Sequence, residues 1–237
     1  MQVEIWSDVV CPWCYIGKRR FEAALDRFAG GEEVEVVYRA FQLDPTAPPG
    51  VTMPVAEAYA RKFGGPERAA EMIANITGLA EAEGLQFHLE RALRANTLLA
   101  HRLLWFAEQR GVQEATKEAL LRAYFSEGRN VADPDELAEL AGGVGLDRDE
   151  VRRFLDSDEG LGEVMEQMAM AASAGITAVP TYVFDGKWAV PGAQDPDTFL
   201  RVLTRVAQLE REEAQATPAP DDGTDPGAVC EDDVCAT

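Results

Sequence analysis

The chain lacks cysteine over almost its whole length. Its four cysteines lie near the two ends, and the 215 residues between Cys14 and Cys230 contain none. A secreted protein held together by disulfides would have cysteines distributed through its body, joining distant loops. The absence excludes such a framework. Closely spaced cysteine pairs outside a framework are more often catalytic, redox-sensing or metal-binding than structural.

Positive charge and long apolar runs are also scarce. The chain has 22 lysine and arginine residues against 42 aspartate and glutamate residues, a formal net charge of −20. An acidic chain repels phosphate backbones and anionic lipid headgroups, so we expect no nucleic-acid and no membrane partner. No apolar run reaches the ~18 residues of a membrane span. The first ten residues, MQVEIWSDVV, lack the features of a secretory leader, so we expect a cytoplasmic location.

The pattern at the start of the chain predicts strand, helix, strand. QVEIWSDVV and VEVVYRAFQL are rich in β-branched and aromatic residues, as strands are. Between them, Phe21, Ala24, Leu25 and Phe28 recur at the spacing of one helical face. A βαβ unit of this kind has parallel strands and a right-handed crossover.

Helical patterns then dominate until strand residues return near the C-terminus. Asp185-Gly186 stands between TYVF and KWAV, which predicts a hairpin with a primed turn. A closing amphipathic helix follows, with Asp195 or Asp197 as its N-cap. The predicted fold is α/β, a βαβ unit and a ββα unit separated by a large all-helical insertion.

This pattern divides the chain into four segments. They are the N-terminal part of the fold (1–52), the helical insertion (53–175), the C-terminal part of the fold (176–209), and an acidic tail (210–237). The tail is rich in proline, glycine and aspartate without periodicity, so we expect it to be flexible. It carries the second cysteine pair, Cys230 and Cys235.

The first pair, in Cys11-Pro12-Trp13-Cys14, falls where the first strand ends and the first helix begins. The free N–H groups and the dipole at a helix start stabilise a thiolate, and proline suits the first helical position. Two intervening residues place the second sulfur one turn along. We therefore predict that Cys11 is the nucleophile and Cys14 the resolving thiol.

Other interpretations of the cysteines remain open at this point. Cys11 and Cys14 could be buried structural residues, or half of a zinc site completed by Cys230 and Cys235. Their place after the first strand of a βαβ unit favours the redox dithiol. The tail pair could form a second redox pair that exchanges with the first, or be incidental thiols. Pro180, before the strand TYVF, could follow a cis bond or be an ordinary edge-strand proline.

Longer stretches resemble a known family. DVVCPWCYIGKRRFE, FQLDP, ANTLLAHRL and GITAVPTYVFDGKWAVPGAQ are similar to the DsbA-like thioredoxin-fold group, which includes FrnE-type oxidoreductases and 2-hydroxychromene-2-carboxylate isomerases. The resemblance implies that Cys11 and Cys14 are the exchange pair. It also implies that Val179 and Pro180 form a cis-proline loop to which a substrate chain can hydrogen-bond. The segment CEDDVC lies outside the family pattern.

The function predicted from these features is thiol–disulfide oxidoreductase or isomerase activity on protein substrates, without cofactor or metal. Partners would be proteins with disulfides or thiols, and small-thiol or thioredoxin-type reductants. Trp13 would offer an apolar surface to the substrate. One alternative is a glutathione-dependent isomerase or transferase, although such relatives typically carry serine at the position of Cys11. The other is a zinc-binding, redox-switched holdase. His101 is interpreted as an ordinary helical residue.

Overall fold

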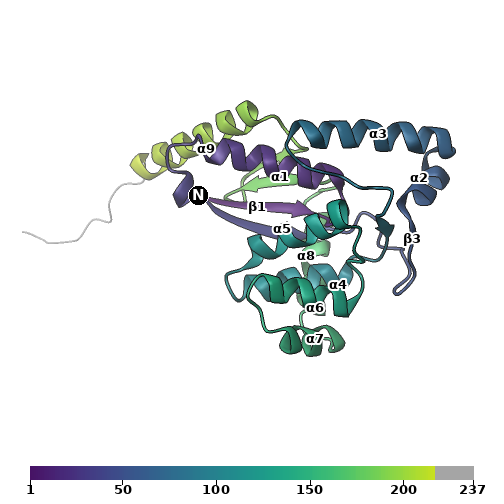
Figure 1. Cartoon of the computed structure of the whole chain (residues 1–237). Helices are drawn as coiled ribbons and strands as arrows, with labels where there is room; N and C mark the ends of the chain where they lie inside the picture. Colours follow the sequence, from purple (N-terminus) through teal and green to yellow (C-terminus); the bar gives the residue numbers. More distant parts are fainter. Residues whose placement is uncertain (217–237) are drawn as a thin grey trace, which may run out of the picture.

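The computed structural model describes residues 1–216 and is built around one mixed sheet (Figure 1). The strand order is β2-β1-β5-β6. Its strands are β1 (Gln2–Ser7), β2 (Glu35–Ala40), β5 (Thr181–Phe184) and β6 (Trp188–Pro191). β1 pairs in parallel with β2 and antiparallel with β5, and β5 pairs antiparallel with β6. The sheet therefore joins the two ends of the described chain.

Helices fill most of the sequence between β2 and β5. Helix α1 (Pro12–Leu25) and the 3-10 turn η1 (Gly31–Glu33) precede β2, and α9 (Pro196–Ala216) follows β6. The helices between β2 and β5 are α2 (Val55–Phe63), α3 (Pro66–Ala82), α4 (Leu98–Glu108), α5 (Gln113–Arg122), α6 (Pro134–Gly143), α7 (Arg148–Asp156) and α8 (Leu161–Ser173), with a π-helical turn η2 (Ala123–Glu127). None of the helices described is long and apolar enough to span a membrane.

The helices form a layer on each side of the sheet. α1 and α9 lie side by side against one face, while α4 to α8 lie on the other side (Figure 1). Val3 and Ile5 of β1 pack with Phe21 of α1 and with Phe199 and Leu203 of α9. The opposite face carries Trp6, which packs with Ala171 of α8 and with both cysteines of the first pair.

The insertion also covers part of the outer edge of β2. The side chain of Gln113 accepts a hydrogen bond from the Tyr38 N–H at 2.8 Å and donates to the Tyr38 carbonyl at 2.9 Å. The side chain of Gln167 accepts from the Ala40 N–H at 2.9 Å. An edge strand with free amide groups invites pairing with other chains. These two glutamines occupy part of that edge and bind the helices to the sheet.

Most elements match the sequence-based expectation. The predicted strands and hairpin are present, and Asp185 and Gly186 both have positive φ, 48° and 66°, as a primed turn requires. Asp195 caps the last helix by accepting from the Thr198 N–H at 2.9 Å. The fold is the predicted α/β arrangement, a thioredoxin fold with a helical insertion.

Two details differ. The insertion, expected to be entirely helical, contains a small antiparallel pair, β3 (Met53–Pro54) and β4 (Leu93–Arg94). Two-residue strands are too short to produce a periodic signal. The last helix runs to Ala216, beyond residue 210, where the tail was expected to begin. The division into four segments remains a prediction.

Helix α1 approaches the sheet closely at Gly17. A Cβ there would lie 2.7 Å from the Tyr182 Oη and 3.2 Å from both the Pro180 Cγ and the Ala193 Cβ. We expect Gly17→Ala to destabilise the fold by about 1–3 kcal/mol, because a well-packed core has no room for the added methyl group. The matched control is Gly78→Ala in α3, where nothing lies within 4 Å.

Gly78→Ala is expected to stabilise by roughly 0.5–1 kcal/mol, since alanine is the better helix former. Thermal unfolding of both variants measures the two effects. Equal shifts of the melting temperature in the same direction would show that the close approach at Gly17 does not affect stability.

Candidate active site

The two cysteines of the first pair lie where the sequence predicts them. Cys11 is the N-cap of α1, and its carbonyl accepts from the Cys14 N–H at 3.0 Å and the Tyr15 N–H at 3.4 Å. Pro12 occupies the first turn, where its missing N–H costs no hydrogen bond. Both cysteines are free thiols. Each is only 3% exposed, so the pair is almost completely covered by its surroundings.

The loop before β5 covers the first of these thiols. The Val179–Pro180 peptide bond is cis, as predicted. The Cys11 Sγ donates a hydrogen bond to the Val179 carbonyl at 3.6 Å. Two segments 168 residues apart in sequence thus meet at the cysteine pair. The partly buried side chains of Phe41 and Ile176 pack against the same cluster.

Trp13, between the cysteines, has a different environment. It is 40% exposed, one of the most exposed large apolar side chains in the described part of the chain. The structure therefore combines two covered sulfur atoms with an apolar ring available at the surface beside them. That is the exposure predicted for a side chain that contacts a substrate.

The surroundings affect Cys14 strongly. Burial raises the pKa of the Cys14 thiol well above its ordinary value, and the neighbouring Cys11 sulfur adds to the increase. The positive charge of Lys117 opposes this effect without cancelling it. Cys14 is therefore held as a neutral thiol unless some group takes its proton.

A buried carboxylate lies directly before the cysteine pair, and the sequence analysis did not single it out. Asp8 is 1% exposed and accepts hydrogen bonds from the N–H groups of Val9 and Leu43, both at 2.8 Å. Its Oδ1 also lies 3.2 Å from the Nε2 of His101, which is 2% exposed. Burial acts to raise the pKa of Asp8, but its contacts with His101 and the Leu43 amide outweigh it, and the pKa falls below 3.8.

The second buried charge that the sequence analysis missed is Lys117 of α5. It is 1% exposed, and its Nζ has no hydrogen-bond partner among the described residues. The ammonium lies 5.5 Å from the centre of the Tyr38 ring. Burial lowers the pKa of Lys117, while the attraction of Cys14 and Asp8 partly restores it. Helical periodicity places Lys117 on one face with Leu120 and Leu121, but this signal does not distinguish a buried lysine from one that extends to water.

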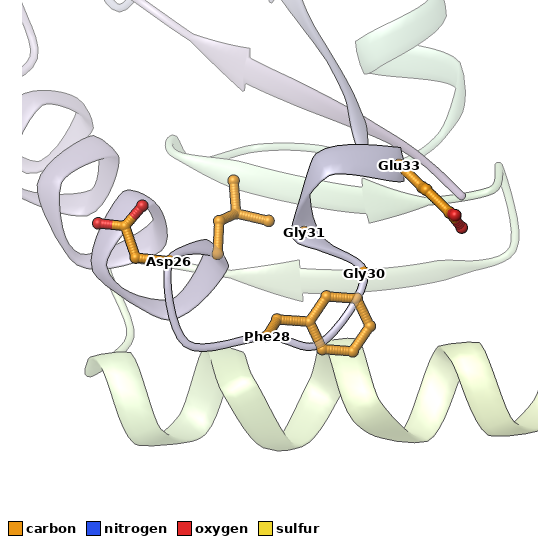
Figure 2. Close-up of a pocket in the computed structure, with 6 residues that line it drawn as sticks. Asp26, Phe28, Gly30, Gly31 and Glu33 are labelled. Carbon is orange, nitrogen blue, oxygen red and sulfur yellow. The ribbon is translucent and has the colours of Figure 1, made fainter.

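A separate hollow of about 480 Å³ lies at the opposite end of α1 from the cysteines (Figure 2). Its lining residues are Leu25, Asp26, Phe28, Gly30, Gly31 and Glu33. The two carboxylates, of Asp26 and Glu33, point away from each other in Figure 2. Binding sites usually have several polar groups that converge on one point. The polar groups of this hollow do not converge, so the cysteine pair remains the candidate site.

The predicted tail residues Cys230 and Cys235 lie outside the described residues. Within residues 1–216, no cluster of three or more histidine, cysteine or acidic side chains could hold a metal ion. The redox and zinc interpretations of the tail pair therefore both remain predictions.

A four-stranded sheet of this order, with a cysteine pair at the start of its first helix, is the architecture of thioredoxin-fold proteins. The chain belongs to the DsbA-like thioredoxin domain family, which it matches over residues 2–204, and whose members include thiol–disulfide oxidoreductases. This confirms the family resemblance at the level of the DsbA-like group.

Individual relatives agree with this assignment. A probable DsbA oxidoreductase from Streptomyces coelicolor is 40% identical, with 92% of each chain covered and a TM-score of 0.83. The uncharacterized protein YwbO of Bacillus subtilis is 30% identical over 207 residues, covering 86% of this chain and 96% of YwbO. A 2-hydroxychromene-2-carboxylate isomerase shares the fold, with 17% identity, a TM-score of 0.65 and coverage of 92% of this chain and 100% of the isomerase.

Proposed function

We propose that the chain catalyses thiol–disulfide exchange on protein substrates through Cys11 and Cys14, as a FrnE-type oxidoreductase or isomerase. The observation that carries the proposal is the contact of the Cys11 Sγ with the Val179 carbonyl at the N-terminus of α1. Cys11 is the N-cap residue of α1, the position that the sequence analysis assigned to the attacking sulfur. The cysteine pair needs no cofactor for this chemistry.

The reaction would begin when the Cys11 thiolate attacks one sulfur of a substrate disulfide. That disulfide breaks, a mixed disulfide forms, and one substrate sulfur leaves as a thiolate. Cys14 then attacks the Cys11 Sγ, forming the Cys11–Cys14 disulfide and releasing the second substrate thiolate. Two electrons pass from the enzyme to the substrate. In isomerisation, a substrate thiol attacks the mixed disulfide instead, and Cys11 is returned without net oxidation.

The neighbouring residues would hold the substrate. In this proposal the loop at Val179 and Pro180 provides backbone groups for an extended substrate chain, in the manner of a strand added to a sheet. Trp13 provides the apolar surface beside it, supported by its 40% exposure. Small thiols or thioredoxin-type proteins would restore the reduced pair, and Cys230 with Cys235 could relay electrons to it. We also propose that the protein is located in the cytoplasm.

The main alternative is a glutathione-dependent isomerase or transferase acting on small molecules, supported by the shared fold of the isomerase. Cysteine at position 11, where such relatives typically have serine, favours protein disulfide exchange. The zinc-binding holdase needs both cysteine pairs as ligands. The structure gives the holdase less support, because the first cysteine pair is buried and the Cys11 Sγ is hydrogen-bonded to the Val179 carbonyl.

The test uses the full-length wild-type protein purified without chelator. We expect it to reduce insulin with a thiol reductant and to reactivate scrambled ribonuclease, with no stoichiometric zinc by metal analysis. Absence of both exchange activities would contradict the proposal. Isomerisation of a small aromatic substrate that depends on glutathione would support the first alternative, and bound zinc the second.

A further inference from the structure

Under the proposed function, on which this inference rests, a protein substrate must lie against the loop before β5. That loop is bonded to the turn that follows β6, residues 192–195, which we call the β6–α9 turn. The Gly192 N–H donates a hydrogen bond to the Pro180 carbonyl at 2.7 Å. The position of the Pro180 backbone, and of Val179 beside it, therefore depends on the position of the β6–α9 turn.

The same two segments also meet over α1. A Cβ at Gly17 would lie 3.2 Å from both the Pro180 Cγ and the Ala193 Cβ. Pro180 and Ala193 thus pack on one place of α1, a single helical turn beyond Cys14. A shift of the β6–α9 turn across α1 would therefore disturb the loop before β5 close to the cysteine pair.

The internal bonds of the β6–α9 turn fix its shape. The Gln194 N–H donates to the Gly192 carbonyl at 3.0 Å, and the Gln194 side chain donates to the Pro191 carbonyl at 2.7 Å. Asp195 joins the turn to α9 as its N-cap. These bonds are all local, so they do not determine where the turn lies against α1.

Arg20 supplies a bond between the turn and α1. Its Nη1 donates to the Ala193 carbonyl at 2.9 Å, and its Nε donates to the Glu83 Oε1 at 2.6 Å. Glu83 is the C-cap of α3, whose end lies beside α1 (Figure 1). The guanidinium is a planar fork that donates to two acceptors in fixed directions. Glu83 therefore orients Arg20, and Arg20 holds Ala193.

The burial of this contact gives it strength. The side chains of Arg20 and Glu83 are only 20% and 22% exposed, so water competes little for their hydrogen bonds. Bonds from a charged donor are also about twice as strong as bonds between neutral groups. An ion pair that only joined α1 to α3 would not need the second bond, to the Ala193 carbonyl.

We propose that Arg20 is a positioning residue for protein substrates. It holds the β6–α9 turn against α1, and the turn holds the loop before β5 through the bond from Gly192 to Pro180. In this arrangement the loop receives an extended substrate chain. A small disulfide has no backbone to place on the loop, so its reaction with Cys11 does not need Arg20.

The test compares two probes with the same coloured leaving group. One is dithiobis(nitrobenzoate), which has no peptide backbone. The other is a synthetic peptide whose single cysteine is joined by a disulfide to one thionitrobenzoate. With either probe, the Cys11 thiolate forms a disulfide with the retained sulfur, and thionitrobenzoate leaves as a coloured thiolate. The full chain carries Cys230→Ser and Cys235→Ser in every sample, so that only the first pair reacts.

Rapid mixing over a range of probe concentrations gives the half-saturating concentration and the maximal rate of colour release. For Arg20→Met we expect the half-saturating peptide concentration to rise roughly tenfold, because a charge-assisted bond that orders the loop is lost. The maximal rate with the peptide, and the rate with dithiobis(nitrobenzoate), should stay within about twofold of wild type, since the variant loses binding and keeps the chemistry.

Arg39→Met is the matched control. The Arg39 side chain of β2 is 21% exposed and also makes two bonds, to Glu4 and Glu108, which lie in neither the loop nor the β6–α9 turn. We expect this variant to bind the peptide probe as the wild type does, whatever its melting temperature. An equal rise of the half-saturating concentration in Arg39→Met would attribute the effect to general destabilisation and overturn the role of Arg20.

Two variants of Glu83 test the orientation of an unchanged Arg20. Glu83→Ala leaves the guanidinium free to rotate, so the half-saturating peptide concentration should rise by about threefold or more. Glu83→Gln keeps an oxygen that can accept from the Arg20 Nε and should bind the peptide nearly as the wild type does. Unchanged binding in Arg20→Met or in Glu83→Ala would overturn the proposal, as would an equal slowing with both probes.

The cysteine pair of the otherwise wild-type chain tests the proposed function separately. With one equivalent of dithiobis(nitrobenzoate), attack by Cys11 releases one equivalent of coloured thiolate, and resolution by Cys14 releases a second. Release of only one equivalent would contradict the proposed function. Release of both, together with unchanged peptide binding in Arg20→Met, would contradict the positioning role alone.

Discussion

Replacing Cys11 with serine is expected to reduce insulin reduction and ribonuclease reactivation to the rate of the thiol reductant alone. A serine hydroxyl is a far weaker nucleophile than a thiolate near neutral pH, so no mixed disulfide can form at position 11. The turbidity of precipitating insulin measures the reduction, and the recovered ribonuclease activity measures the isomerisation. Activity of Cys11→Ser above that background would show that Cys11 is not the nucleophile.

Cys14→Ser is the matched variant for this experiment. It keeps the nucleophile but cannot resolve the mixed disulfide, so substrate should remain covalently attached to Cys11. Mass spectrometry under non-reducing conditions detects the adduct. Adducts on Cys11→Ser and none on Cys14→Ser would reverse the two roles.

Replacing Asp8 with alanine is expected to destabilise the fold by about 3–5 kcal/mol, the usual cost of removing one member of a buried charged or hydrogen-bonded group. The substitution leaves the Val9 and Leu43 N–H groups and the His101 ring without their acceptor. At ~2–4 °C per kcal/mol for a chain of this size, the melting temperature should fall by roughly 6–20 °C.

The effect of Asp8 should depend on pH in a defined direction. Its pKa is lower in the folded state than the ordinary 3.8, so its contribution is present above that value and is lost as the pH falls through the folded pKa. The difference in unfolding free energy between wild type and Asp8→Ala should therefore be largest near neutral pH and shrink below about pH 4.

Asp44→Ala is the control for this prediction. Asp44 pairs with Arg94 and is 38% exposed, and surface pairs contribute only about 0–1 kcal/mol. If Asp8→Ala melts within a degree or two of Asp44→Ala, the buried contacts of Asp8 do not stabilise the fold.

Local patterns were sufficient to predict the elements that form the sheet. The runs that become β1 and β2, and the Asp-Gly turn between β5 and β6, follow from alternation and turn chemistry within a few residues. The cysteine pair and its position at the start of α1 are equally local. The predictions that rest on family resemblance concern contacts between distant segments, such as Cys11 with Val179.

The buried charges could not be predicted in the same way. Asp8 follows a strand and resembles any polar residue at its end, and its partners Leu43 and His101 come from distant segments. Lys117 lies on the apolar face of α5, a signal that is present in the sequence but ambiguous, because long side chains often extend from such faces to water. Only the packing of α5 against β2 and α1 shows that the Lys117 side chain does not extend to water.

The low exposure of both cysteines has a consequence for the choice of substrate. A sulfur that is 3% exposed cannot reach a disulfide held flat on the surface of a folded protein. The partner must present its disulfide on a strand free to bend into the site, and folded proteins do so only during brief local openings. Under the proposed function, the opening equilibrium of the substrate would then limit the rate for folded partners, while unfolded chains would react without a preceding opening step. Such an enzyme would distinguish folded proteins from unfolded ones by their local flexibility, independently of their sequence.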